Sequence, residues 1–399
     1  MWSLNAKLAS LLFVVFLLPA RAGDPSFRQD KFRGRNALIL ENELVRVSLL
    51  RGGGHVAEVR FVTGGPARTT NPMRVPHYQT IEPYEFEEAK HAPIYQGGIA
   101  GRVLGGYMGQ LLCLPEFGEL KEASIVEWKV TDVKAGADAL TLRYEAELPR
   151  SMFRVGRIIT LPAKSSVVFV EEWAENLVGS GRPMHWVEHV TLGPPFTEPG
   201  KTFLDMAPAR WAGGRRGVGL TETPVRWPHG VASDGSPLDL RPFQPNPHAS
   251  RYDAYLLDHG RPYSYFTMYH SGLPVLIGYV FPAAENPWLV DWQENLSVQG
   301  KPWDGKVIAR GIEFGTTPFD EGIRRSVERG RYLGTLPFRW INGQQRLTTR
   351  YLFFLADIPA GFKGVADVQL RDRVVIVQPA GPGAAIALPT GSVPIEGFK

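Results

Sequence analysis

The sequence predicts an all-β protein built as a large antiparallel β-sandwich. Glycine and proline are frequent, with 43 and 33 residues among 399, and aromatic residues make up 11% of the chain. This composition is typical of short strands joined by turns. Strand-like segments follow one another from Ser124 to Glu175 with no amphipathic helix between them, which indicates antiparallel neighbours. No repeat or linker divides the chain, so we expect one domain over residues 23–399 with its core at about 36–378.

The first residues have the form of an export signal. Lys7 precedes the apolar run Leu8–Leu18, and Ala20-Arg21-Ala22 has the small-x-small pattern of a cleavage site. The apolar run is shorter than the roughly 20 residues that a membrane-spanning helix needs. We therefore expect a signal peptide over residues 1–22, cleaved after Ala22, and a bacterial protein that is periplasmic or secreted without a stable membrane span. An uncleaved membrane anchor is the alternative.

The N-terminal part begins with a predicted hairpin. Apolar and polar side chains alternate in Ala37–Leu50, the pattern of a half-buried strand. The turn is Arg51-Gly52-Gly53-Gly54, and His55–Val62 is the returning strand. Residues Thr63–Gly98 show no period, so we expect a long irregular excursion, and such ordered loops are often functional.

The remaining strands are apolar or alternating segments bounded by turn residues. In order they are Ser124–Val133, Leu140–Leu148, Arg154–Leu161, Val167–Glu175, Tyr252–Asp258, Tyr263–His270, Leu273–Phe281, Trp288–Asn295, Lys306–Glu313, Gln345–Leu355 and Val365–Gln378. Between them, Lys201–Arg251 is expected to be mostly loop, and Phe319–Gly330 is expected to contain the one short helix. Gln345–Leu355 and Val365–Gln378 are expected to close the sheet, and the tail after Pro379 is expected to lie on the surface.

The charge and the cysteine content exclude several classes of protein. The formal net charge is only +4, and acidic and basic residues are interspersed, so the chain lacks the basic surface that nucleic-acid binding requires. One cysteine, Cys113, rules out an internal disulfide framework. The sequence does not indicate an oligomeric state.

Two histidines and a glutamate stand within five residues in the stretch Pro183–Phe196. On a helix, His185, Glu188 and His189 would have the spacing of a zinc peptidase. The flanking prolines and the β-forming residues in the stretch instead favour a strand. His185 and His189 would then share a face about 13 Å apart at about 3.3 Å per residue, too far apart to share one metal ion. A zinc hydrolase using these three residues remains a third alternative.

Four segments, in this order, give the chain a resemblance to a known family. They are Asn42-Glu43-Leu44-Val45-Arg46-Val47 followed by Gly52-Gly53-Gly54-His55-Val56-Ala57; Glu188-His189-Val190-Thr191-Leu192; Tyr252-Asp253-Ala254-Tyr255-Leu256-Leu257; and Ile312-Glu313-Phe314 with Pro318-Phe319-Asp320. Together they resemble the galactose mutarotase-like superfamily, and the chain looks like a divergent member of its aldose 1-epimerase family. The resemblance covers about residues 36–378 and implies a sugar or oligosaccharide as ligand.

The resemblance also implies roles for single residues. Glu313 matches the catalytic base and His189 the general acid, and such a pair can move protons to and from a sugar at near-neutral pH. Asp253 matches the carboxylate that holds sugar hydroxyls. The family's arginine loop is not recognisable, and Arg102 is the candidate replacement. The expected reaction is interconversion of sugar anomers, with no metal and no cofactor.

Further side chains are expected at the same cleft. Trp186, Trp292 or Trp303 could cover the apolar face of a pyranose ring. His185 and His55 could contact the ligand. The alternative from another class is a non-catalytic carbohydrate-binding protein, which would need the aromatic residues but not the His189 and Glu313 pair.

Overall fold

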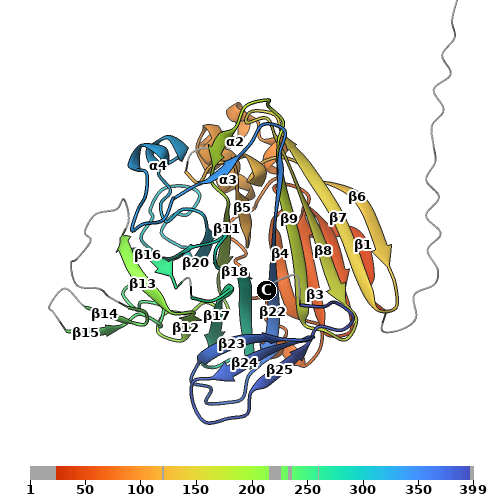
Figure 1. Cartoon of the computed structure of the whole chain (residues 1–399), viewed down its shortest axis with the longest axis vertical. Helices are drawn as coiled ribbons and strands as arrows, with labels where there is room; N and C mark the ends of the chain where they lie inside the picture. Colours follow the sequence, from red (N-terminus) through yellow and green to blue (C-terminus); the bar gives the residue numbers. More distant parts are fainter. Residues whose placement is uncertain (1–23, 119–120, 215–225, 232–235, 259, 396–399) are drawn as a thin grey trace, which may run out of the picture.

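The computed structural model describes residues 24–118, 121–214, 226–231, 236–258 and 260–395. It consists mainly of antiparallel β-sheets, which confirms the predicted fold class (Figure 1). The expected signal peptide, residues 1–22, lies outside the described residues. Across the described ranges, no helix combines the length and the apolar character that crossing a membrane requires.

Two large sheets form the body of the molecule. The six-stranded sheet has the order β13 (Ala209–Gly214), β16 (Ala249–Leu257), β19 (Trp288–Asn295), β20 (Ile308–Gly315), β11 (Val187–Leu192) and β5 (Leu111–Cys113). The eight-stranded sheet has the order β12 (Thr202–Met206), β17 (Tyr263–His270), β18 (Val275–Pro282), β22 (Arg346–Asp357), β9 (Val167–Asn176), β8 (Phe153–Pro162), β7 (Ala139–Leu148) and β6 (Lys129–Ala135). All the neighbouring strands within these two sheets run antiparallel.

Smaller sheets extend this body at both ends of the chain. The four-stranded sheet contains β1 (Ser26–Phe32), β2 (Arg35–Glu41), β3 (Val45–Leu50) and β4 (Val56–Phe61). An isolated bridge from Val56 to Gln110 places β4 beside the residue that precedes β5. Two-stranded ribbons are made by β10 (Arg182–Met184) with β21 (Arg339–Ile341), and by β14 (His229–Val231) with β15 (Pro237–Asp239).

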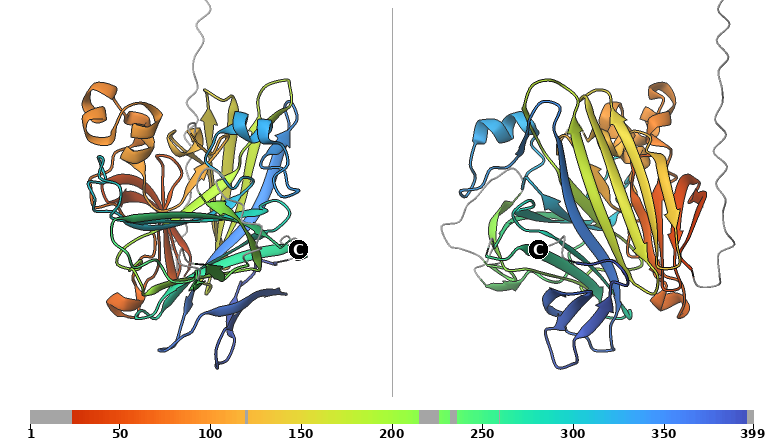
Figure 2. Two further views of the ribbon diagram at one scale, coloured as in Figure 1. Left: turned by 90° about the vertical axis from the view of Figure 1, so that its left-hand side faces the viewer. Right: turned by 45° about the vertical axis from the view of Figure 1, so that its right-hand side comes forward.

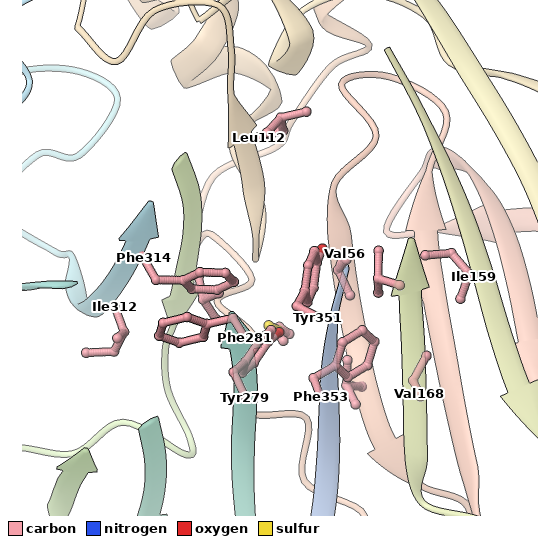
Figure 3. Close-up of a cluster of buried hydrophobic side chains, with 14 of the residues drawn as sticks. Val56, Leu112, Ile159, Val168, Tyr279, Phe281, Ile312, Phe314, Tyr351 and Phe353 are labelled. Atoms are coloured by element: carbon pink, nitrogen blue, oxygen red, sulfur yellow. The ribbon is translucent and has the colours of Figure 1, made fainter. Parts of the chain in front are cut away.

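The main core lies between the two large sheets and also contains apolar side chains of β2, β3 and β4. Tyr279 and Phe281 from β18 and Tyr351 from β22 contact Phe314 of the six-stranded sheet, and Phe353 from β22 packs beside Tyr279 (Figure 3). The ring of Phe281 stacks on that of Phe314 from β20, with centroids 4.2 Å apart. Because both faces of the central strands are covered, their sequences are apolar on both sides and not strictly alternating.

The C-terminal strands do not close the large sheet, as Val365–Gln378 was expected to do. They form a separate sheet from β23 (Val365–Arg371), β24 (Val374–Pro379) and β25 (Ile386–Pro389), drawn in dark blue (Figures 1 and 2). Its apolar side chains pack against the outer face of β17, β18 and β22 in a second hydrophobic cluster. A strand pattern shows that a strand exists but not which sheet it joins, and this is why the prediction was wrong.

The expected irregular excursion contains helices. It holds α1 (Gly65–Arg68), η1 (Pro83–Glu85) and α2 (Glu88–Tyr95). The next helix, α3 (Gly98–Gly106), starts at its last residue, and the short turn η2 (Glu122–Ser124) lies further along the chain. The sequence hides them because α2 contains a proline, Pro93, and α3 contains four glycines, both of which are unfavourable in helix interiors. The predicted helix within Phe319–Gly330 is confirmed as α4 (Ile323–Arg329), whereas Lys201–Arg251, expected to be mostly loop, contains β12, β13 and the start of β16.

Candidate active site

The pairing of β11 with β20 brings the two expected proton-transfer groups together. His189 and Glu313 are direct partners across the two antiparallel strands, although they are more than 120 residues apart in the sequence. The imidazole Nε2 lies 2.9 Å from Oε1 of Glu313. The side chain of Glu313 is 3% exposed and that of His189 is 11% exposed, so the pair is largely shielded but still open on one side.

The pair lies on the outer face of the six-stranded sheet, away from the main core. Across the sheet, His189 pairs with Glu313 on one side and with Leu111 on the other. Two residues further along the strands, Gly311 pairs with Thr191 on one side and with Trp292 on the other. Residues from this face line a cavity of about 280 Å³. Its walls are Val103, Leu104, Tyr107, Leu111, Phe117, Lys121, His189, Ser250, Tyr252, Trp292, Glu294, Ser297, Val298, Trp303, Glu313 and Asp320.

Aromatic rings enclose the imidazole within this cavity. The rings of Tyr107 and Trp292 meet the ring of His189 edge-on, with centroids 5.8 and 5.9 Å away, and Trp303 lies 5.8 Å from Trp292. Gly311 makes this arrangement possible, since a Cβ at that position would lie only 2.7 Å from Trp292 Cε3 and 3.0 Å from His189 Cε1. The absence of a side chain at Gly311 therefore leaves the space that the indole of Trp292 and the imidazole of His189 occupy.

Two polar atoms in the walls of the cavity are without a partner. Oε2 of Glu313 and Nε1 of Trp303 are buried and make no hydrogen bond within the described ranges. Buried polar groups are rarely left unpaired, because the loss of hydration is not compensated. Both residues line the cavity, so an acceptor and a donor beside it are suited to a ligand that carries both donor and acceptor groups.

The structure places Asp253 on the other face of the sheet. Its strand partner is Asp291, whose neighbour Ile312 belongs to the main core, whereas Tyr252 on the opposite face lines the cavity. The Asp253 carboxylate accepts a hydrogen bond from Trp211 Nε1 at 3.0 Å and is paired with Arg251. Burial raises the pKa of Asp253. The carboxylate is thus engaged within the protein and does not reach the cavity.

His185 and His55 are also kept away from the cavity. His185 is fully buried; its Nδ1 accepts a hydrogen bond from the backbone N–H of Phe117 at 3.0 Å and its Nε2 lies 2.9 Å from Ser326 Oγ. His55 is fully buried with Nε2 at 3.2 Å from the carbonyl of Ser124. Burial lowers the pKa of His185 to about 4 and that of His55 to about 3. Both rings are held neutral within the fold.

Arg102 and Trp186 also lie away from the pair. The guanidinium of Arg102 stacks over Phe86 at 5.4 Å and borders a separate surface hollow beside β6 and β7. Trp186 is buried in the core, where its Nε1 donates to Glu172. Of the three tryptophans expected at the cleft, the structure brings Trp292 and Trp303 to it.

The arrangement also separates the three residues of the zinc interpretation. Glu188 points to the opposite side of β11 from His189, where it accepts from Arg157 at 3.0 Å and from Gln110 at 2.6 Å. Burial raises the pKa of the Glu188 carboxyl. His185 is engaged with Ser326, and among the described residues no three His, Cys, Asp or Glu side chains come together as a metal site would require.

Several cavity residues were not identified from the sequence. Tyr107 and Phe117 come from the segment between α3 and β6, and Tyr252 comes from β16. Thr191 does not line the cavity, but it carried a usable signal, because the strand alternation placed it on the face of His189. Thr191 Oγ1 lies 3.0 Å from Nδ1 of His189 and 2.6 Å from the phenol oxygen of Tyr107.

Comparison with known proteins gives a fold but no close sequence relative. No protein-family model matches the chain, and no curated protein matches it significantly. Among solved structures, a galactose mutarotase-like protein from Clostridium acetobutylicum is similar, with a TM-score of 0.58 and 12% identity over 84% of this chain and 99% of that one. A candidate aldose 1-epimerase from Klebsiella pneumoniae has a TM-score of 0.54 and 11% identity over 82% and 80% of the two chains.

A candidate aldose 1-epimerase from Escherichia coli K12 gives the same result, with a TM-score of 0.52 and 12% identity over 80% of this chain and 98% of that chain. The chain therefore has a galactose mutarotase-like fold. At this level of identity the similarity shows the fold alone. What the cavity does must be argued from its own residues.

Proposed function

We propose that this protein is an exported isomerase of the aldose 1-epimerase type, which interconverts the anomers of a sugar. The observation that carries the proposal is the His189–Glu313 pair, held at 2.9 Å at a cavity that is lined by Trp292 and Trp303. A proton donor, a proton acceptor and aromatic surfaces are what such a reaction needs. The similarity of fold to candidate aldose 1-epimerases supports the same proposal.

In the proposed reaction, Glu313 acts as the base and His189 acts as the acid. Glu313 takes the proton of the C1 hydroxyl through its unpartnered Oε2. Protonated His189 gives its Nε2 proton to the ring oxygen. The bond between C1 and the ring oxygen then breaks, and C1 becomes an aldehyde carbon. After rotation about the bond between C1 and C2, the open-chain hydroxyl attacks the other face of C1, and both protons return to the groups that they left.

The adjacent positions of the two groups suit this chemistry. The two oxygens that exchange protons are both bonded to C1, so the acid and the base must act close together. Neighbouring strands hold them there through the backbone hydrogen bonds of the sheet. Sugar binding must then replace the bond between His189 and Glu313, as the C1 hydroxyl donates to Glu313 and the ring oxygen accepts from His189.

The size of the cavity favours a single sugar unit. About 280 Å³ is near the lower end of the roughly 300–1,000 Å³ typical of small-molecule sites. The indoles of Trp292 and Trp303 offer apolar surface to the C–H face of a pyranose, and the free Nε1 of Trp303 offers a donor to a hydroxyl oxygen. An ordinary neutral aldose is therefore the first ligand to test.

The direct test is the rate at which a freshly dissolved aldose reaches anomeric equilibrium, followed by polarimetry or proton NMR. We expect wild-type protein to accelerate it and Glu313→Gln to lose about 10²–10⁴-fold in kcat, the range for removal of a general base. Glu147→Gln, at an exposed position of β7, is the matched control and should keep full activity. If wild-type protein binds sugars but does not change the rate, the protein is a carbohydrate-binding module without catalysis.

The export signal makes an independent part of the proposal. When the full chain is expressed in a Gram-negative host, we expect it in the periplasm or the medium, beginning at Gly23 after removal of residues 1–22. N-terminal sequencing of the fractionated protein measures this. A chain that keeps residues 1–22 and stays with the membrane fraction would contradict it.

A further inference from the structure

Two hydroxyl groups hold the ring nitrogen of His189 that the proposed reaction does not use. Thr191 Oγ1 lies 3.0 Å from Nδ1, and the phenol oxygen of Tyr107 lies 2.6 Å from Thr191 Oγ1. Both side chains are buried, and neither hydroxyl has another hydrogen-bond partner in the part of the chain that the structure describes. Tyr107, Thr191 and His189 thus form a line that continues through Nε2 to Glu313.

The hydrogen-bond donors along this line determine which ring nitrogen of a neutral His189 imidazole carries the proton. Each hydroxyl has one proton to donate. If Tyr107 donates to Thr191, and Thr191 donates to Nδ1, every proton is used, and the neutral ring carries its own proton on Nε2. If Nδ1 carried the proton, Nε2 would present a lone pair to the Glu313 carboxylate, which can only accept, and Thr191 would have to donate to Tyr107, whose phenol proton would have no acceptor among the described residues unless a ligand enters the cavity. The first arrangement leaves no buried donor unpaired.

The phenol hydroxyl of Tyr107, at the end of this line, remains a hydrogen-bond donor. Burial raises the pKa of the Tyr107 phenol, so the phenol keeps its proton and the line orients the imidazole without carrying protons along it. Arg74 fixes both hydroxyl residues: its backbone N–H donates to the carbonyl of Thr191 at 2.9 Å, and its Nη1 donates to the carbonyl of Tyr107 at 3.2 Å. The guanidinium also lies 4.8 Å from the centre of the Tyr107 ring.

We propose that Thr191 and Tyr107 are positioning residues that set the tautomer of His189. In the resting neutral ring they leave Nδ1 as an acceptor and direct Nε2–H to Glu313. The charged ring that acts as the acid carries a proton on both nitrogens, and once Nε2 has given its proton to the sugar ring oxygen, the neutral ring keeps its remaining proton on Nδ1 until Nε2 takes the other proton back. In the charged imidazole the line reverses, because Nδ1–H then donates to Thr191 and Thr191 donates to Tyr107. The phenol proton turns to the cavity that Tyr107 lines, where an oxygen of a bound sugar can accept it.

The kinetic part of this inference depends on the proposed function, but the tautomer is a property of the resting protein. The two are therefore tested separately. The first measurement is ¹⁵N NMR of protein labelled at its nine histidines, with the signals of His189 assigned from a His189→Asn variant. At a pH where the ring is neutral, we expect an unprotonated Nδ1 that accepts a hydrogen bond and a protonated Nε2.

Substitution separates positioning from general stability. We expect Thr191→Val, which has nearly the same shape, to give a mixture of tautomers and a kcat about 10- to 100-fold lower, with KM changed less than about threefold. Thr191→Ser should restore both the single tautomer and most of the kcat. Tyr107→Phe leaves Thr191 one partner fewer and should have a smaller effect in the same direction.

Two variants elsewhere serve as controls. Thr267→Val and Tyr255→Phe each remove a buried hydroxyl that has no hydrogen-bond partner among the described residues, and should leave both tautomer and kcat unchanged. Circular dichroism and thermal unfolding confirm that each variant is folded. A wild-type Nδ1–H tautomer, or a Thr191→Val protein whose His189 spectrum matches that of Thr267→Val, would overturn the inference. Wild-type protein with the expected tautomer but no effect on anomerisation would instead refute the proposed function.

Discussion

Gly311 offers a severe test of the site, because this residue bonds to no ligand and takes no part in proton transfer. It lies between Thr191 and Trp292 on the cavity face of the sheet. Its φ angle is outside the left-handed region, so the backbone itself tolerates alanine. In the folded protein the consequence of Gly311→Ala is therefore the added methyl group and the atoms that it displaces.

The displacement follows from the structure. The new Cβ would lie 2.7 Å from Trp292 Cε3 and 3.0 Å from His189 Cε1, whereas carbon atoms meet at about 3.5–4.0 Å. The indole must therefore retreat by about 1 Å and the imidazole by about 0.5–1 Å. A misplacement of that size at a reacting group costs about 100-fold in rate. The free energy of unfolding should fall by about 1 kcal/mol, because overpacking is partly relieved by movement into the cavity.

The assay compares kcat, KM and urea unfolding of Gly311→Ala with those of Gly179→Ala. Gly179 also has an ordinary φ, and a Cβ there would meet no atom within 4 Å, so its replacement controls for the smaller conformational entropy of the unfolded alanine chain. We expect the Gly311 variant alone to lose activity while remaining folded. If its kcat and its sugar affinity equal those of the Gly179 variant, the indole and imidazole positions do not matter to function, and the reasoning is wrong.

Three further predictions follow from the same geometry. Asp253→Asn should leave sugar affinity within about twofold of wild type by calorimetry, but should lower the free energy of unfolding by about 1–3 kcal/mol, since a charge-assisted bond is removed; a large loss of affinity would contradict the placement of Asp253 outside the cavity. The pKa of His185, lowered by burial to about 4, is below the unfolded value of about 6.5. Its contribution to stability is therefore present above pH 6.5 and is lost as the pH falls through 4. The difference in free energy of unfolding between wild type and His185→Gln should shrink by about 1.4 kcal/mol per pH unit in that window. Urea unfolding at pH 7 and pH 5 measures this difference, and an equal difference at the two pH values would refute the prediction. Trp303→Phe should raise KM about three- to tenfold with a smaller change in kcat, because it removes a donor that is unpartnered in the described structure; unchanged steady-state constants would argue against contact with the ligand.

The sequence predicted the fold class because turn residues and β-forming residues recur throughout the chain. It also predicted that His189 and Thr191 share a face, since alternation along a strand is a property of the backbone. The same rule failed for His185, which lies between β10 and β11 and belongs to neither strand. Outside a strand the direction of a side chain is set by the local turn, so the face shared by His185 and His189 could not be extrapolated.

The position of Asp253 shows a different limit of sequence reasoning. The run Asp253–Leu257 is buried throughout, because one side of β16 faces the main core and the other faces the cavity and its surroundings. A strand that is covered on both sides carries apolar residues on both, and its sequence no longer reveals which side is which. The sequence predicted a strand over Tyr252–Asp258, but only the pairing with Asp291 shows that Asp253 lies on the face of the sheet that is turned to the core.

The direct bond between His189 and Glu313 limits what the cavity can bind. Side chains that are directly opposite on neighbouring strands have Cβ atoms about 4.5–5.5 Å apart, so an imidazole and a carboxylate in these positions meet whenever nothing lies between them. A ligand must compensate both groups for the bond that it breaks. An apolar molecule offers no donor to Glu313 and no acceptor to His189, so its binding would leave two buried polar groups unpaired. A cyclic aldose offers both at one carbon atom, and the closed pair therefore selects for a ligand that presents a hydroxyl and a ring oxygen together.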